Sequence, residues 1–160
     1  MKDLRRGTTA DHDALVALQN AAYAQNAVIL GATPLPLQAD YGDILRNMEV
    51  WLIESGAQPD GAQLDGAQLD GALVLEFRAA DMLIWSIASH PRARGAGIGR
   101  RLLDHAQLRA REERRDIIRL YTAEVLIANI EWYGRNGFAI ESREQLADRT
   151  LVNMVKKTAF

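Results

Sequence analysis

The sequence predicts an α/β protein built around one mixed β-sheet. Runs typical of strands and amphipathic runs typical of helices alternate along the chain, in the order β-α-α-β-β-β-α-β-α-β-β. Some neighbouring strands are joined by short turns and others through a helix, which gives antiparallel and parallel pairs in one sheet. The 160 residues suit a single domain, 1–160, that is large enough to bury its own core.

The N-terminal part predicts a short strand, two helices and three further strands. Residues suited to helix N-caps precede an apolar stripe spaced i, i+3 and i+7, namely Thr8, Thr9 and Asp11, then Leu15, Leu18 and Ala22. A loop with two prolines leads to a second short helix near residues 38–48. Three β-type runs follow, VWLIES, GALVLEF and DMLIWSIAS. The last is mostly apolar, so we expect it at the centre of the sheet.

A pentapeptide repeat, GAQPD-GAQLD-GAQLD, separates the first two of these β-type runs. Without two of its units the segment would read ESGAQPDGALVLEF, an ordinary strand–turn–strand with an Asp-Gly turn. The alternative, a pentapeptide-repeat β-helix, needs several stacked coils to bury a core, more than three short units supply. We therefore interpret the repeat as a lengthened hairpin loop at about residues 56–71.

The C-terminal part predicts two more helices and three strands. The first of these helices runs from Ile98 to about Arg114, with one apolar stripe and an outward pair of Arg100 with Asp104 at i, i+4. The second is short, LIANIEWYGRN, and Gly137 is placed to end it in the left-handed conformation. The strand runs are DIIRLYT between the two helices, then FAIES and TLVNMVKK.

The stretch SHPRARGAGIGRRLL, residues 89–103, joins the central strand run to a helix. A helix N-terminus offers unpaired N–H groups and a positive dipole end, and glycines let a phosphate approach the backbone. The stretch therefore predicts a turn that binds phosphate or pyrophosphate; the alternative is a plain connection with an arginine-rich surface. It lacks the Lys-Ser/Thr of a P-loop, and Leu102 stands where a Rossmann fingerprint has its third glycine.

Composition and charge narrow the classes of function. There is no cysteine, which excludes disulfides and thiolate chemistry, and three dispersed histidines give no reason to expect a metal. Residues 92–119 hold nine arginines against four acids, a local +5, while the net charge of −2 leaves −7 elsewhere. An anionic ligand would be drawn to this region.

The chain gives no sign of a membrane association. No apolar run approaches the roughly 20 residues of a membrane span, and MKDLRRGTT lacks a signal-peptide core. We expect a cytoplasmic protein.

The glycine stretch and a second motif together resemble a known family. IASHPRARGAGIGRRLL resembles motif A of the Gcn5-related N-acetyltransferase (GNAT) superfamily, where Arg94, Gly97 and Gly99 match the Arg/Gln-x-x-Gly-x-Gly/Ala spacing. YGRNGF resembles the family's second marker, and the likeness is firmest from Leu83 to Phe138. It implies a single-domain acyl-CoA N-acyltransferase fold, a mixed, mostly antiparallel sheet of roughly six to seven strands with about four helices.

The resemblance also implies a cofactor and a set of site residues. Acetyl-CoA is the expected co-substrate, without a metal, held between two splayed strands. Its pantetheine arm is expected on the backbone of Ile87, Ala88 and Ser89. Its pyrophosphate is expected on the amides of the glycine turn, from Arg94 through Gly95, Ala96, Gly97, Ile98 and Gly99 to Arg100.

Acetyl transfer to an amine needs a neutral amine, donors for the oxyanion and a proton for the leaving thiolate. The resemblance implies that Tyr133 supplies the proton and that a backbone N–H of the central strand supplies the donor. No carboxylate lies on LIWSIAS, so the base stays open among Glu76, Glu124, His90 and a chain of waters. Many relatives have an asparagine where this chain has Leu126; Asn129, one helical turn before Tyr133, takes that role or caps its helix.

The predicted function is N-acetyl transfer from acetyl-CoA to a primary amine of a small molecule or a protein. An acyl-CoA-binding sensor without catalysis is the alternative. A nucleic-acid binder is disfavoured, since acids offset the basic segment and no helix-turn-helix is evident. The acceptor is expected between the first two helices and the last hairpin, near Tyr23, Tyr41, Asp40 and Asp43, whose acids would attract a cationic amine. The resemblance allows a homodimer.

Overall fold

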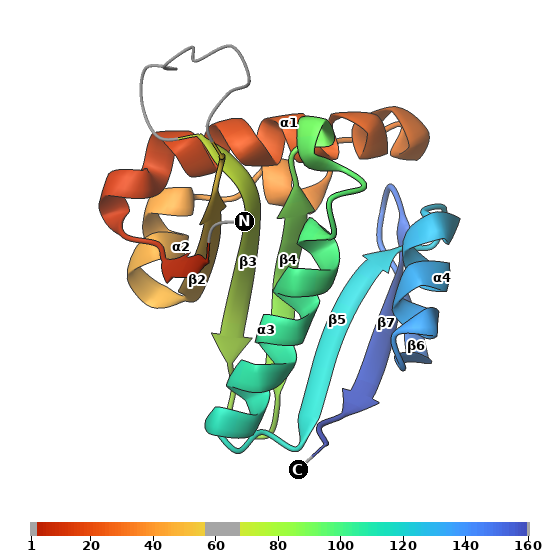
Figure 1. The fold of residues 1–160 in the computed structure, drawn as a ribbon. Coiled ribbons are helices and arrows are strands. Elements are labelled where there is room, and N and C mark those ends of the chain that lie inside the picture. The colour runs from red at the N-terminus through yellow and green to blue at the C-terminus, as the bar shows by residue number, and fades with distance from the viewer. Residues whose placement is uncertain (1–2, 57–67, 160) are drawn as a thin grey trace.

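The computed structural model describes residues 3–56 and 68–159, and its elements follow the predicted order (Figure 1). The strands are β1 (Leu4–Arg6), β2 (Glu49–Glu54), β3 (Leu69–Phe77), β4 (Met82–Ser89), β5 (Ile117–Ala123), β6 (Ala139–Gln145) and β7 (Thr150–Lys157). The α-helices are α1 (His12–Leu30), α2 (Tyr41–Asn47), α3 (Ile98–Glu112) and α4 (Ile127–Arg135). Short 3-10 turns lie at Thr9–Asp11, Leu35–Leu37 and Pro91–Ala93.

The seven strands form one sheet in the order β1-β2-β3-β4-β5-β7-β6. All neighbouring pairs are antiparallel except β4 with β5, which are parallel because α3 carries the chain back between them. The mixed, mostly antiparallel sheet is therefore confirmed. The apolar run 82–89 is the fourth of the seven strands, the central position expected for it.

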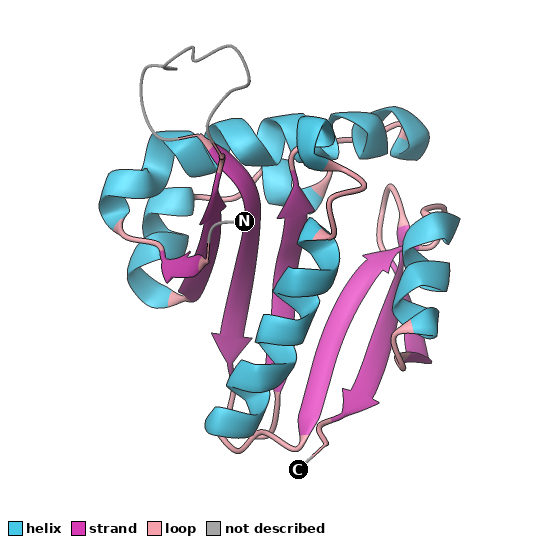
Figure 2. Ribbon diagram, in the orientation of Figure 1, coloured by secondary structure: helices cyan, strands magenta, loops and turns pink. Residues whose placement is uncertain are grey.

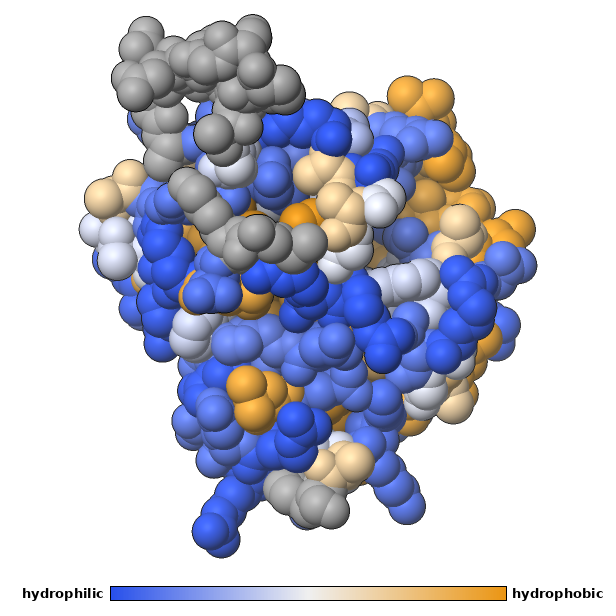
Figure 3. Space-filling model, viewed as in Figure 1, coloured by the Kyte–Doolittle hydropathy of each residue, from blue (hydrophilic) through white to orange (hydrophobic). Residues whose placement is uncertain are grey.

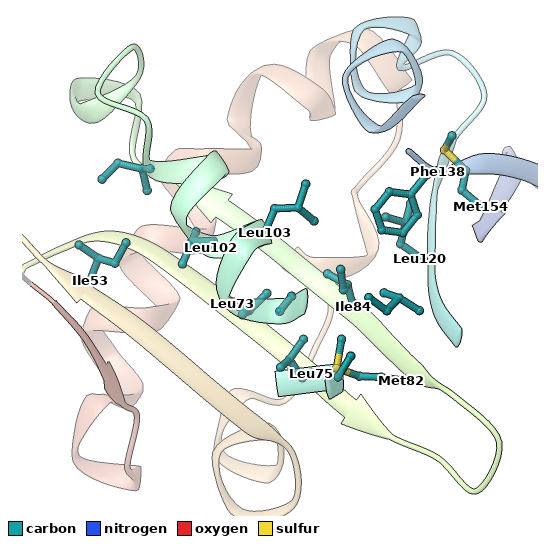
Figure 4. Close-up of a cluster of buried hydrophobic side chains, with 14 of the residues drawn as sticks. Ile53, Leu73, Leu75, Met82, Ile84, Leu102, Leu103, Leu120, Phe138 and Met154 are labelled. Carbon is teal, nitrogen blue, oxygen red and sulfur yellow. The ribbon is translucent and has the colours of Figure 1, made fainter. Parts of the chain in front are cut away.

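Helices cover both faces of the sheet and bury two separate cores (Figure 2). On one face α3 lies across β3, β4 and β5, and its stripe is buried as predicted: Ile98, Leu102, Leu103, Ala106 and Ala110. Figure 4 shows this cluster, in which the leucines of α3 meet Leu73, Leu75 and Ile84 of the sheet. On the other face α1 and α2 pack against β2 and β3, with Leu15 and Leu18 fully buried.

Strand β4 contains a bulge at Trp85 and separates from β5 just beyond it. The register with β3 shifts between Val74 and Leu75, which face Ser86 and Ile84, so Trp85 is the extra residue. The parallel ladder with β5 comprises three pairs and ends at Ile84 with Leu120. From residue 85 onward β4 has no strand beside it on that edge, and Figure 1 shows the two strands diverging there.

Several predicted boundaries shift for identifiable reasons. The second helix begins at Tyr41 rather than near 38 because the Asp40 side chain accepts from the Asp43 amide (3.1 Å) and caps it. Helix α3 ends at Glu112, two residues early, and Arg114 takes a left-handed φ of 52°. Gly137 has φ 92° just after α4, as predicted.

The predicted hairpin loop at 56–71 falls largely on residues 57–67, which lie outside the described residues. The strands on either side, β2 and β3, pair as antiparallel neighbours. The predicted end of the loop is wrong by three residues, because Leu69, Asp70 and Gly71 already belong to β3. Across 3–56 and 68–159, no helix combines the length and the apolar character needed to cross a membrane.

Replacing Gly71 with alanine tests how closely α3 packs on the sheet. An added Cβ would lie 2.5 Å from Ile98 Cγ2 and 3.2 Å from Leu102 Cδ1, both in the core. We expect Gly71→Ala to destabilise the fold by about 1–3 kcal/mol, as overpacking does. That corresponds to a melting temperature lower by roughly 2–12 °C.

The control is Gly134→Ala, which places a Cβ in open space on helix α4. We expect it to raise stability by up to about 1 kcal/mol. Equal melting temperatures for the two variants would contradict the close approach at Gly71.

Candidate functional site

A cavity of about 760 Å³ opens where β4 and β5 separate. Residues of both strands line it, together with α1, the loop between α1 and α2, the start of α3, the first turns of α4 and the segment around Arg149 and Leu151. This volume lies within the usual range of ligand pockets, roughly 300–1,000 Å³. Strand separation, rather than a hollow in the core, therefore creates the candidate site.

The glycine turn stands at the mouth of this cavity. Gly95 and Gly97 have φ of 87° and 78°, and a Cβ on either would meet nothing within 4 Å. Gly97 is the N-cap of α3, whose first helical bond runs from the Arg101 amide to the Gly97 carbonyl (3.0 Å). The amides of Ile98, Gly99 and Arg100 therefore precede the helical ladder, the arrangement of an anion-binding helix N-terminus.

Two other amides of the turn already have partners. Arg94 N donates to Pro91 O (3.3 Å) and Ala96 N donates to Ala93 O (3.2 Å). These bonds close the short 3-10 turn between β4 and α3. The amides of Arg94 and Ala96 are therefore less available to a phosphate than those of Ile98, Gly99 and Arg100 at the start of the helix.

The arginines of residues 92–119 do not all face this turn. Arg94 donates to Ala22 O (3.1 Å) and Gln25 Oε1 (3.3 Å), which fastens the turn to α1. Arg92 is bound to Asp70 and Ser55, whereas Arg109 and Arg119 form ion pairs near the other end of α3 and of β5. Only part of the +5 expected to attract an anion therefore lies at the turn.

Residues Ile87, Ala88 and Ser89 follow the bulge and line the cavity, as expected of a backbone edge that binds a ligand. Tyr23 of α1 reaches this edge: its hydroxyl lies 2.9 Å from Ser86 Oγ and donates to Ile87 O (3.2 Å). Burial raises the pKa of Tyr23 to about 12, so the phenol is neutral at physiological pH.

Tyr133 of α4 lines the same cavity as Tyr23. Its ring packs edge-on against Trp132 and Phe138, with ring centroids 5.0 and 5.8 Å apart. Burial, followed by the proximity of Tyr23, raises the pKa of Tyr133 above its ordinary value. The phenol therefore keeps its proton through neutral pH and is held as a donor facing the cavity.

Asn129 also lines the cavity, and it does not cap its helix. Its Nδ2 donates to Thr122 Oγ1 of β5 (3.4 Å), while Leu126 occupies the N-cap of α4. The helix-cap role is therefore wrong, and the contact with the cofactor stays a prediction.

The three candidate bases lie away from the cavity lining. Glu124 is exposed and paired with Arg143 (3.1 Å), and His90 Nδ1 accepts from the Arg92 amide (3.2 Å). Burial lowers the pKa of His90. Glu76 lies near the end of β3 and is likewise not among the lining residues. None of the three is placed to accept a proton inside the cavity.

The acids expected to attract a cationic acceptor are also outside the cavity. Asp40 caps α2, and Asp43 Oδ1 accepts a hydrogen bond from Asn47 Nδ2 (2.6 Å). Tyr41 is buried beneath the loop after α1 and donates to Pro36 O (2.6 Å). Of the residues expected near the acceptor, the structure places only Tyr23 in the lining.

Sequence reasoning missed Arg149, which fastens the far side of the cavity. Its side chain is 4% exposed and is paired with Asp148 through Nε (2.9 Å) and Nη2 (2.8 Å). Nη2 also donates to Thr33 O (2.8 Å), which joins the β6–β7 loop to the α1–α2 loop. The bond joins residues 116 positions apart, and no local pattern signals it.

Comparisons with known proteins identify the class. The family model of the acetyltransferase (GNAT) domain matches residues 47–140, more than half of the chain. The chain belongs to this family, the GNAT acetyltransferases. No curated protein matches the chain.

Solved structures share the fold at low sequence identity. The ribosomal-protein-S18-alanine N-acetyltransferase of Escherichia coli is 14% identical over 100% of this chain and 96% of its own, with a TM-score of 0.76. The PaiA N-acetyltransferase of Thermoplasma acidophilum, solved with coenzyme A, is 17% identical over 98% and 99%, with a TM-score of 0.71. A GNAT acetyltransferase of Staphylococcus aureus Mu50 is 16% identical over 98% and 99%, with a TM-score of 0.74.

Replacing Arg149 with glutamine tests whether the two loops depend on each other. Thr33 would lose its charged donor, and such hydrogen bonds are worth about 1.5–3 kcal/mol. We expect faster amide hydrogen exchange in 31–37 and 146–150, with little change in the sheet. Arg143→Gln is the control, since its ion pair with Glu124 is exposed; equal exchange in both variants would contradict the coupling.

Proposed function

We propose that this chain transfers the acetyl group of acetyl-CoA to a primary amine, by direct attack while both substrates are bound. The observation that carries the proposal is the separation of β4 from β5 beside a glycine turn at a helix N-terminus. The first offers an unpaired strand edge to an extended chain, and the second offers amides to a diphosphate. Coenzyme A carries both an extended pantetheine chain and a diphosphate in one molecule.

The residues present fit such a co-substrate. The pantetheine arm would lie along Ile87, Ala88 and Ser89, where β4 has no neighbour from β5. The diphosphate would lie on the amides of Ile98, Gly99 and Arg100. The positive φ of Gly95 and Gly97 sets the path of the turn that leads to these amides. The coenzyme A complex of the Thermoplasma neighbour supports the choice of ligand. Asn129 would contact the cofactor from α4.

The chemistry then requires few groups. The amine nitrogen forms the N–C bond and loses one proton, the C–S bond breaks, and the departing sulfur gains one proton. We assign the proton that the sulfur gains to Tyr133, whose phenol stays protonated near neutral pH. The proton that the nitrogen loses passes through water to the Tyr133 oxygen, which restores the phenol and closes the balance. A backbone N–H of β4, from residue 87, 88 or 89, would stabilise the oxyanion. An amine that enters without its extra proton needs no carboxylate base for this balance.

Binding of coenzyme A can be tested through heat stability. A ligand at 100 times its dissociation constant adds about 2.7 kcal/mol, or roughly 5–11 °C for a domain of this size. We expect that shift for the native chain and a much smaller one for Gly97→Ala, because alanine is strained at φ 78°.

Gly31→Ala is the matched control. Gly31 also has a left-handed φ, 67°, with nothing within 4 Å of its Cβ position, but it ends α1 outside the turn. Both variants should lose about 1–2 kcal/mol of stability, and only Gly31→Ala should keep the full shift with coenzyme A. No shift in the native protein would refute the proposed function.

Replacing Tyr133 with phenylalanine separates an enzyme from a sensor that only binds acyl-CoA. The aromatic packing on Trp132 and Phe138 stays, and the donor is lost. We expect turnover, followed by thiol release, to fall by about 10²–10⁴-fold with the coenzyme A shift unchanged. An unchanged rate in Tyr133→Phe would remove the assigned role.

A further inference from the structure

The side of the cavity that faces the α1–α2 loop and the β6–β7 loop has apolar walls. Ile29 and Leu30 come from the end of α1, Leu35 from the loop after it, Trp85 from the bulge of β4, and Leu151 from β7. Trp85 stands at the bulge of β4, and its ring meets Tyr41 edge-on with centroids 6.1 Å apart. An acceptor bound here would exchange water for hydrocarbon.

The charged groups that line the cavity in 3–56 and 68–159 are two guanidinium groups. Arg94 is bound to Ala22 and Gln25 of α1, and Arg149 is paired with Asp148, whose own side chain lies largely in solvent. Neither offers a negative charge to an entering ammonium ion.

The phenols that face the cavity are neutral as well. They come from α1, β5 and α4, namely Tyr23, Tyr121 and Tyr133, and burial raises the pKa of each. The lining residues therefore present neutral or positive groups to an acceptor. Two carboxylates come close without lining the cavity: Glu76, whose charge also raises the pKa of Tyr121, and Asp148, which is paired with Arg149.

The rim of the cavity is apolar too. Ile29 at the end of α1 and Val125 and Ile127 at the start of α4 line the cavity while remaining 53%, 53% and 63% exposed. Figure 3 shows hydrophobic surface gathered on the side of the molecule where α1 ends. Large apolar side chains left this exposed around one opening favour an apolar ligand.

An ammonium ion would enter such a site at a cost. It would lose water without gaining a counter-ion, so the neutral amine is the form that binds. At pH 7 about a tenth of an α-amino group is neutral, against fewer than one in a thousand lysine-like amines. The same walls would gain from burying hydrocarbon attached to the amine.

We propose that the acceptor is a small apolar amine of low basicity, of the α-amino type, which enters the cavity uncharged, and that polycationic amines are rejected. This inference rests on the proposed acetyl transfer and names the substrate class for it. It also explains how the reaction proceeds with Glu76, Glu124 and His90 away from the lining: the acceptor arrives already deprotonated.

The test compares L-phenylalaninamide, 2-phenylethylamine and spermidine with the full chain and acetyl-CoA. The first two carry the same ring on an α-amino and an alkyl amine. At pH 7 we expect kcat/KM for the amide to exceed that for phenylethylamine by about 100-fold, following the neutral fractions. The difference should shrink as pH rises toward 10, and spermidine should be the poorest of the three.

A preference for spermidine, equal rates for the two phenyl compounds at pH 7, or acetylation of none of the three would overturn the inference. Heat stabilisation by coenzyme A, measured on the same sample, keeps these outcomes distinct from failure of the proposed function. If coenzyme A does not stabilise the protein, the proposed function fails, and the inference about the acceptor fails with it.

A pair of variants at the rim gives a second readout. Ile29 is half exposed on α1, where glutamate and glutamine are both good helix formers. Glutamate and glutamine have nearly the same shape, so Ile29→Glu differs from Ile29→Gln mainly by its negative charge. We expect kcat/KM for spermidine to be a few-fold higher in Ile29→Glu than in Ile29→Gln, the size of an exposed ion pair, with phenylalaninamide unaffected by the difference. A spermidine rate that is equal in the two variants would count against selection by charge.

Discussion

The structure depends on the early end of the ladder between β4 and β5. Three parallel pairs hold the strands together, and the bulge at Trp85 then turns β4 toward α1 while β5 continues to α4. Beyond Ile84 this edge of β4 has no neighbouring strand, so an extended ligand can lie along it beside the bond from Tyr23 to Ile87 O. The proposed binding of the coenzyme and of the acceptor both depend on this opening, and Tyr133 lines it.

Contacts on both sides of the gap between β4 and β5 hold the elements that line it. The parallel connection through α3 places the helix N-terminus, with its free amides, at the end of β4 where the strands diverge. Arg94 fastens the turn to α1, and Arg149 fastens the two loops on the opposite side. Tyr23 and Tyr133 then face the gap from different helices, so neutral donors meet where the chemistry is proposed.

The sequence predicted what local patterns determine. The order of elements, the central position of residues 82–89, the buried stripe of α3, its Arg100–Asp104 pair (3.0 Å) and the left-handed Gly137 follow from spacing and turn chemistry. The bulge at Trp85 and the bond from Arg149 to Thr33 depend on partners far along the chain. The acids near the acceptor were misjudged for a related reason: Asp40 and Asp43 satisfy the local needs of α2.

Amide hydrogen exchange with and without coenzyme A tests the central claim most directly. If the unpaired edge of β4 and the start of α3 receive the ligand, peptides covering 85–89 and 97–100 should exchange more slowly when it is bound. Peptides of β1 and β2, which lie away from the opening, should not change. Protection confined to other segments, or none at residues 85–89, would contradict the account.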